Sequence, residues 1–148
     1  MRCSELKVLF SGGGTAGHIN PAIAVAKHFR QMEKKTEILF VGTQRGMEVE
    51  LVPREGFDLK LIKVRGLKRK LSFELVLAVK EFIQGMVEAG KIIREFKPDI
   101  VIGTGGYVCG PVVLIAAMMN IPTVIHEQNA FPGLTNRLLS RFADITAI

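Results

Sequence analysis

The feature that most constrains this chain is the repeated order of a short apolar segment, a glycine-rich or polar turn, and a helical segment. Strands are predicted at 7–10, 37–41, 59–64, 100–103, 123–126 and 143–148. Helices are predicted at 19–32, 47–52, 73–96, 111–119 and 134–141, the first with Pro21 in its opening turn. Such apolar strands need cover on both faces, and strands that alternate with helices pair in parallel. We therefore expect an α/β fold, a doubly wound parallel sheet with the third strand near an edge.

Composition excludes several classes of protein. A length of 148 residues suits one domain. The longest nearly apolar run, 107–119, contains Gly110 and Pro111 and is shorter than the roughly 20 residues that span a bilayer. Two cysteines without CxxC or histidine-rich spacing predict reduced thiols in the cytoplasm and no metal site. Few aromatics and no Trp argue against a nucleic-acid partner, and we expect no signal peptide.

Three unusual loops follow predicted strands, at 12–18, 103–110 and 126–133. In a parallel sheet the loops that follow strands share the carboxyl edge, where ligands bind. The first loop has Gly12, Gly14 and Gly17 in G-x-G-x-x-G spacing, so its backbone amides and the following helix N-terminus suit a pyrophosphate. The alternative is a tight turn. Since 42–45 holds no acid, NAD is disfavoured, whereas Arg45 leaves an NADP-binding domain open.

His18 follows the last glycine of that loop. A neutral imidazole beside a phosphate site is a reasonable general base for a hydroxyl, and a capping or phosphate-contacting histidine is the alternative. The second loop carries four glycines and Tyr107, which suggest another surface for close approach. Packing of helix against strand would explain about two of those four glycines.

The third loop begins His126, Glu127, Gln128, Asn129, and such polar residues need partners when buried. His126 and Glu127 point to opposite faces of a continued strand, so we expect a sugar or phosphate surface rather than a metal site. A polar network that holds the loop together is the alternative.

The whole charge excess of +6 lies in 60–70, which has six bases and no acid. The helix that follows is apolar around most of its circumference. Val76, Ile83 and Met86 are therefore expected to be exposed beside a basic turn, an arrangement that suits an anionic membrane surface. That turn is formed by Lys68, Arg69 and Lys70. The alternative is a core helix buried on two sides.

Taken together and in order, GGGTAGHINPAIAVA, KPDIVIGTGGYVCGP and IPTVIHEQNAFPGLTNRLL make the chain similar to the N-terminal domain of the MurG family over essentially all its length. These bacterial transferases add N-acetylglucosamine to undecaprenyl-pyrophosphoryl-N-acetylmuramoyl-pentapeptide in peptidoglycan synthesis. The resemblance implies a Rossmann-like half of a glycosyltransferase B fold at 1–148 that binds the lipid acceptor. A C-terminal domain, absent here, would hold most of the UDP-N-acetylglucosamine.

The resemblance also implies an inverting reaction without metal or cofactor, at the cytoplasmic side of the cell membrane, with His18 as candidate base. It implies contacts to diphosphate or sugar from the first loop, to the donor from Asn129, and lining roles for the remaining motif positions. Those positions are Gly14, Thr15, Ala16, Gly17, Tyr107, His126, Glu127 and Asn136. Ala16 replaces a family glycine, so its methyl group hinders the closest approach.

We expect this chain alone to be inactive in transfer. A non-catalytic membrane-docking subunit of a split glycosyltransferase is the second hypothesis, and an NADP-binding domain is the third. Amides of the glycine loops that already bind the protein's own groups would contradict the pyrophosphate interpretation.

Overall fold

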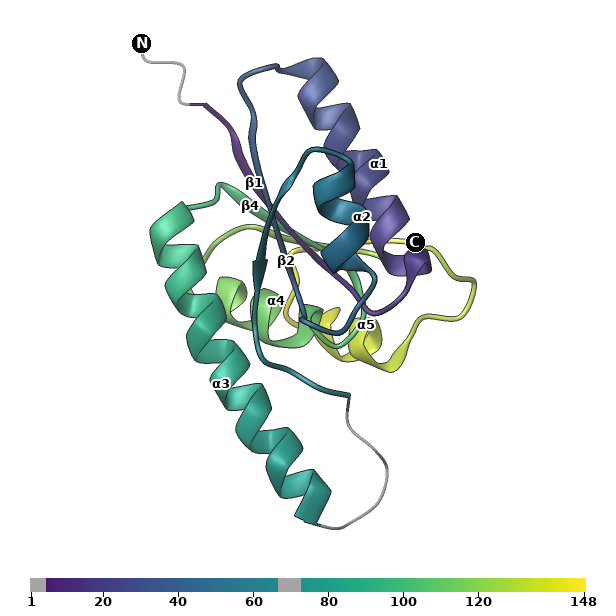
Figure 1. Cartoon of the computed structure of the whole chain (residues 1–148), viewed down its shortest axis with the longest axis vertical. Helices are drawn as coiled ribbons and strands as arrows, with labels where there is room; N and C mark the ends of the chain where they lie inside the picture. Colours follow the sequence, from purple (N-terminus) through teal and green to yellow (C-terminus); the bar gives the residue numbers. More distant parts are fainter. Residues whose placement is uncertain (1–4, 67–72) are drawn as a thin grey trace.

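A computed structural model describes residues 5–66 and 73–148. Its six strands form one parallel sheet in the order β3-β2-β1-β4-β5-β6 (Figure 1). The strands are β1 (Lys7–Gly12), β2 (Glu37–Gly42), β3 (Asp58–Leu61), β4 (Ile100–Gly105), β5 (Thr123–His126) and β6 (Ile145–Ala147). The helices are α1 (Ala16–Met32), α2 (Glu48–Arg54), α3 (Phe73–Phe96), α4 (Cys109–Met118) and α5 (Leu134–Leu139). The doubly wound sheet is confirmed, and β3 is an edge strand as predicted.

Alternating side chains place two apolar cores on the two faces of the sheet. In β1, Val8 and Phe10 pack with residues of α1 and α2, whereas Leu9 faces α3 and α4. Phe10 stacks on Phe40 with ring centroids 5.1 Å apart, which joins β1 to β2 within the first core. With helices packed on both faces of the sheet, the loops that follow the strands lie together at its carboxyl edge.

The start of the first helix differs from the prediction. α1 begins at Ala16, inside the glycine-rich segment, rather than at residue 19, so Pro21 lies within the helix and not in its first turn. The apolar periodicity that sets the predicted start begins only where the helix meets the core. Because of the earlier start, His18 lies in the first helical turn.

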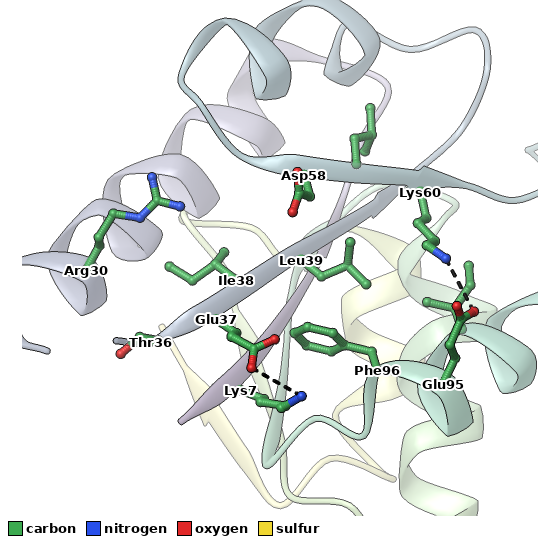
Figure 2. A pocket seen from close by; sticks show the side chains of 12 residues that line it. Lys7, Arg30, Thr36, Glu37, Ile38, Leu39, Asp58, Lys60, Glu95 and Phe96 are labelled. Atoms are coloured by element: carbon green, nitrogen blue, oxygen red, sulfur yellow. Dashed lines mark hydrogen bonds and ion pairs between the residues drawn. The ribbon is translucent and has the colours of Figure 1, made fainter. Parts of the chain in front are cut away.

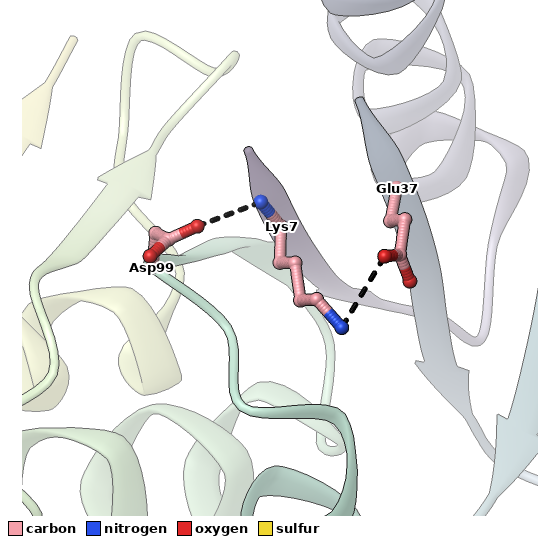
Figure 3. A network of polar contacts seen from close by, with 3 residues as sticks. All are labelled: Lys7, Glu37 and Asp99. Carbon is pink, nitrogen blue, oxygen red and sulfur yellow. Dashed lines mark hydrogen bonds and ion pairs between the residues drawn. The ribbon is translucent and has the colours of Figure 1, made fainter. Parts of the chain in front are cut away.

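The amino edge of the sheet carries paired charges. Figure 2 shows a cavity of about 670 Å³ around the start of β2, lined by residues such as Arg30, Thr36 and Asp58. Lys7 pairs with Glu37 at 3.3 Å, and its backbone N–H donates to the Asp99 carboxylate at 2.8 Å (Figure 3). These contacts join the starts of β1, β2 and β4 and leave little unbalanced charge there.

Candidate functional site

The three unusual loops meet at the carboxyl edge, as the sequence predicts. They line one cavity of about 260 Å³. Its walls are formed by Gly13, Gly14, Thr15, His18, Gly105, Gly106, Tyr107, Glu127, Gly133, Leu134, Thr135 and Asn136. β1 and β4 are neighbours in the middle of the sheet, where the strand order reverses. Doubly wound sheets bind ligands at this reversal, so fold and cavity indicate the same place.

The amides of the first loop divide into two groups. Gly13 N–H donates to the Gly105 carbonyl at 3.3 Å, and Gly14 N–H donates to the Glu48 carboxylate at 3.0 Å. For these two amides the expectation of an open pyrophosphate site is wrong. Within residues 5–66 and 73–148, no protein acceptor bonds the amides of residues 15–17. These three amides form the N-terminus of α1, where the helix dipole favours an anion.

Glu48 is a residue that sequence reasoning missed. Its side chain is fully buried although charged, and it follows β2, where we found no acid within 42–45. Its carboxylate accepts hydrogen bonds from Thr43 N–H at 2.7 Å and Thr43 Oγ1 at 2.9 Å, besides that from Gly14. A Cβ at Gly13, Gly42 or Gly46 would collide with the side chain of Glu48. Glu48 therefore fixes the first loop through Gly14 and is not among the residues that line the cavity.

The glycines of the second loop pack against other parts of the protein. Gly106 has φ +88°, and a Cβ there would overlap the carbonyl of Gly13. A Cβ on Gly103 would come within 2.9 Å of Val113, and one on Gly110 within 3.0 Å of Phe82. With Gly105, which lies under the ring of His18, all four glycines meet protein atoms. Packing of helix against strand accounts for Gly103 and Gly105, about two of the four as expected, whereas Gly106 packs on the first loop and Gly110 on α3.

Tyr107 extends from the second loop with 61% of its surface exposed. A Cβ on Gly66 would strike the Tyr107 ring, so the ring lies on the backbone of Gly66. The side chain thus covers one side of the cavity from a fixed base, which fits its predicted lining role.

His18 is held by Thr104, a second residue that the sequence analysis missed. The Thr104 hydroxyl donates to the His18 carbonyl at 2.6 Å, and the Thr104 carbonyl lies 3.2 Å from His18 Nδ1. Thr104 is fully buried at the end of β4. A threonine among glycines after an apolar strand is the signal that could have pointed to it, although its partner is 86 residues away.

The third loop is organised around the buried carboxylate of Glu127. This carboxylate accepts hydrogen bonds from Asn129 N–H at 3.0 Å, Asn129 Nδ2 at 2.9 Å, Gly133 N–H at 3.1 Å and Asn136 Nδ2 at 2.9 Å. Burial by itself would raise the pKa of Glu127, but these hydrogen bonds together lower it below the ordinary glutamate value. The alternative of a polar loop network describes Glu127 and Asn136, and contact of either with substrate stays a prediction.

Several buried polar atoms at this edge have no protein partner within the described residues. They are Ser11 Oγ, His126 Nδ1, Gln128 Oε1 and Asn136 Oδ1. Buried polar atoms normally have partners, and each exception needs an explanation such as a bound ligand, ion or water. Gln128 also brings its Nε2 to 2.8 Å from His18 Nδ1, which connects the third loop with the first.

Cys109 lies next to the site, but its thiol is not reactive. Its thiol donates to the Ser11 carbonyl at 2.8 Å and is completely buried. Burial raises the pKa of this thiol to about 11, and hydrogen bonds lower it only in part. At neutral pH the group is a protonated thiol, not a nucleophile.

The helix α3 exposes an apolar stripe. Val76 and Ile83 are exposed as predicted, but Met86 is half-buried, so its predicted exposure is wrong. The stripe consists of Phe73, Val76, Val79, Ile83 and Val87, with exposed fractions from 48% to 77%. The periodicity of an almost wholly apolar helix cannot decide which side chains face the core. In the described chain no helix is both long and apolar enough to cross a membrane.

The charges around that stripe are partly balanced. Arg65 pairs with Glu81 at 2.7 Å and Lys60 with Glu95 at 3.3 Å, so acids of α3 compensate part of the basic segment. The predicted turn of Lys68, Arg69 and Lys70 lies outside the described residues.

Comparison with known proteins agrees with this geometry. The profile of the glycosyltransferase family 28 N-terminal domain matches residues 8–148. The chain belongs to glycosyltransferase family 28. A relative from Acetivibrio thermocellus is 64% identical over 97% of this chain, and one from Thermoanaerobacter sp. is 61% identical. Both are named UDP-N-acetylglucosamine--N-acetylmuramyl-(pentapeptide) pyrophosphoryl-undecaprenol N-acetylglucosamine transferase.

A solved structure supports the same family. The crystal structure of Acinetobacter baumannii MurG has a TM-score of 0.82, is 35% identical, and is matched over 95% of this chain and 40% of that one. These similarities confirm the resemblance to the N-terminal domain of the MurG family. The family 28 domain described here spans 39% of the length of the two named relatives.

Proposed function

We propose that this chain forms the acceptor-binding half of a transferase that moves N-acetylglucosamine from UDP-N-acetylglucosamine to undecaprenyl-pyrophosphoryl-N-acetylmuramoyl-pentapeptide. The observation that carries the proposal is the cavity at the strand-order reversal, where open helix amides and a fixed imidazole face the same space. The names of the relatives supply both substrates.

The amides of Thr15, Ala16 and Gly17 hold the pyrophosphate of the acceptor. They point from the positive end of α1 and need no side-chain charge to bind a phosphate oxygen. The methyl group of Ala16, where the family has glycine, limits how closely that oxygen approaches. Gly14 has no atom within 4 Å of a Cβ position, so it leaves room beside the bound group.

His18 is the general base. Its ring lies in the same cavity, within reach of a hydroxyl of a sugar attached to that pyrophosphate. The acceptor 4-hydroxyl oxygen forms a bond to the anomeric carbon of the donor while the bond from that carbon to the UDP oxygen breaks. The electron pair leaves with UDP, and the hydroxyl proton passes to His18 Nε2.

Asn129 and Tyr107 contact the sugars from the rim. Asn129 is exposed, and its Nδ2 donates to Glu127, which orients its Oδ1 outward as an acceptor. Tyr107 offers an exposed ring and hydroxyl. Glu127, Asn136 and His126 support these contacts from the loop behind. The second part of the relatives, which this chain does not span, supplies most of the donor site.

The direct test is transfer by the full-length protein that contains this chain. We expect His18→Ala to lower turnover by about 10²- to 10⁴-fold, the range for loss of a general base. His28→Ala is the matched control, because His28 is exposed on the same helix outside the cavity. Equal turnover of His18→Ala and wild type would remove His18 from the mechanism. Absence of transfer by the wild-type protein would reject the function.

We propose that this half binds the cytoplasmic membrane surface as a peripheral protein, and the exposed apolar stripe of α3 supports this. We expect salt-sensitive binding to vesicles that contain anionic lipid, since each base near such a surface contributes about 1 kcal/mol. Charge reversal at Lys68, Arg69 and Lys70, and separately Ile83→Asp, should weaken sedimentation with these vesicles. Equal binding to neutral vesicles would contradict the proposal.

A further inference from the structure

We propose that Gln128 and the Thr104 carbonyl are positioning elements that keep the proton of neutral His18 on Nδ1, so that Nε2 is the bare nitrogen. The inference rests on the proposed function, in which His18 accepts a proton. It assigns a role to Gln128, the one residue of the segment 126–129 that the proposed function leaves unused.

The Thr104 carbonyl favours the Nδ1–H tautomer. It lies 3.2 Å from His18 Nδ1, and a carbonyl oxygen can only accept a hydrogen bond. If Nδ1 carried no proton, two lone pairs would face each other at that distance. The Thr104 hydroxyl donates to the backbone of His18, so the carbonyl cannot move away without losing this second contact.

Gln128 approaches the same nitrogen with its amide, 2.8 Å away. Its Oε1 is buried without a protein partner among the described residues. A half-turn of the amide places Oε1 against Nδ1–H and turns the NH₂ group to the unpartnered side. Either orientation of the Gln128 amide leaves one of its two polar groups without a partner. The fixed carbonyl of Thr104 therefore favours the orientation in which Gln128 Oε1 is a second acceptor for Nδ1–H.

Gly105 allows this arrangement. A Cβ on Gly105 would lie 2.5 Å from His18 Nδ1, so only a glycine lets the ring rest on the backbone there. With Nδ1 held against the protein, the opposite nitrogen carries the lone pair. When Nε2 accepts a proton, two acceptor oxygens at Nδ1–H stabilise the imidazolium. This is the arrangement that a base needs before and after it acts.

The test is long-range proton–nitrogen NMR of the 148-residue chain at about pH 8, above the ordinary imidazole pKa of about 6.5. The histidine signals are assigned with His18→Asn. His28 is an exposed reference on the same helix, observed in the same spectrum. We expect the Nδ1–H tautomer at His18 and the usual solution mixture at His28. A proton on Nε2 of His18 would overturn the proposal.

Two variants of Gln128 isolate its contribution. Gln128→Glu keeps only acceptor oxygens and should preserve the Nδ1–H tautomer. Gln128→Ala removes the acceptor and should shift part of His18 to the Nε2–H tautomer, while the His28 signals stay unchanged. If Gln128→Ala leaves the His18 tautomer unaltered, Gln128 is not a positioning residue. Because these readouts need no substrate, they can fail while transfer by the full-length protein succeeds, or the reverse.

Kinetics of the full-length protein provide the second readout. We expect Gln128→Ala to lower kcat about tenfold with little change in the KM for UDP-N-acetylglucosamine, and Gln128→Glu to restore most of that loss. Unchanged kcat in Gln128→Ala would overturn the role in catalysis. A rise in KM alone would show that Gln128 binds the donor instead.

Discussion

The two edges of the sheet differ in a way that cavity size does not reveal. The amino edge holds the larger cavity, about 670 Å³, but its charges are largely paired, as between Lys7 and Glu37. The carboxyl edge holds about 260 Å³, yet it combines open helix amides with unpartnered buried atoms of His126, Gln128 and Asn136. Among the described residues the amino edge leaves one such atom, Thr36 Oγ1. Unsatisfied polar groups, rather than volume, therefore distinguish the carboxyl edge, where we propose that substrate binds.

The largest expected difference between the edges is the loss of unfolding free energy when a glycine is replaced by alanine. Gly106→Ala would overlap the Gly13 carbonyl at the carboxyl edge, so we expect unfolding free energy to fall by about 2–4 kcal/mol. Gly56→Ala, between α2 and β3, meets no atom within 4 Å and bears only the penalty of φ +79°, about 1–2 kcal/mol. Urea unfolding measures both. Equal losses would show that the two loops do not interlock.

The two edges should also differ in how much stability is lost when a carboxylate is replaced by an amide. Glu48→Gln puts an amide against donors from Gly14 and Thr43, so it should cost about 2–3 kcal/mol. Glu37→Gln removes a surface ion pair and should cost about 0–1 kcal/mol. Chemical denaturation of both variants tests this order. A Glu37 variant as destabilised as the Glu48 variant would contradict it.

Glu127 makes the stability of the carboxyl edge depend on pH. Since folding lowers the pKa of Glu127, its contribution is complete above the unfolded value of about 4.3 and is lost as pH falls through the folded value. We expect Glu127→Gln to cost about 2 kcal/mol at pH 7 and progressively less below about pH 4. Urea unfolding at several pH values gives the difference between the two proteins. A difference that stays constant with pH would refute the ionised network.

The smallest expected effect is the lack of reaction of the Cys109 thiol in the native protein. With a pKa of about 11 and complete burial, its thiol should not react with iodoacetamide in the native protein at neutral pH. A Cys3→Ser background leaves Cys109 as the single thiol, followed by mass spectrometry. Labelling should appear only on addition of denaturant. Rapid labelling of the native protein would mean that the buried region around Cys109 opens readily.

Sequence reasoning succeeds where the pattern is local. The apolar runs give the strands and their order in the chain, and the loops that follow strands must share an edge. It fails where a contact joins distant segments. Glu48 reaches the first loop from a neighbouring helix, and Thr104 reaches His18 from the neighbouring strand β4. Neither contact produces a periodic pattern in the sequence. Glycines at 13, 42 and 46 are the only local sign that something large fills the space between them.

The double contact between Thr104 and His18 has a practical consequence. The imidazole takes its position from the central strand and the first turn of the helix, both parts of the rigid framework. Residues 130–132 are exposed and donate no hydrogen bond to Glu127, so they can be exchanged for other sequences without moving the imidazole of His18. Variants that test the proposed acceptor site should therefore change residues 130–132 and leave residues 12–18, 103–106 and 127–129 as they are.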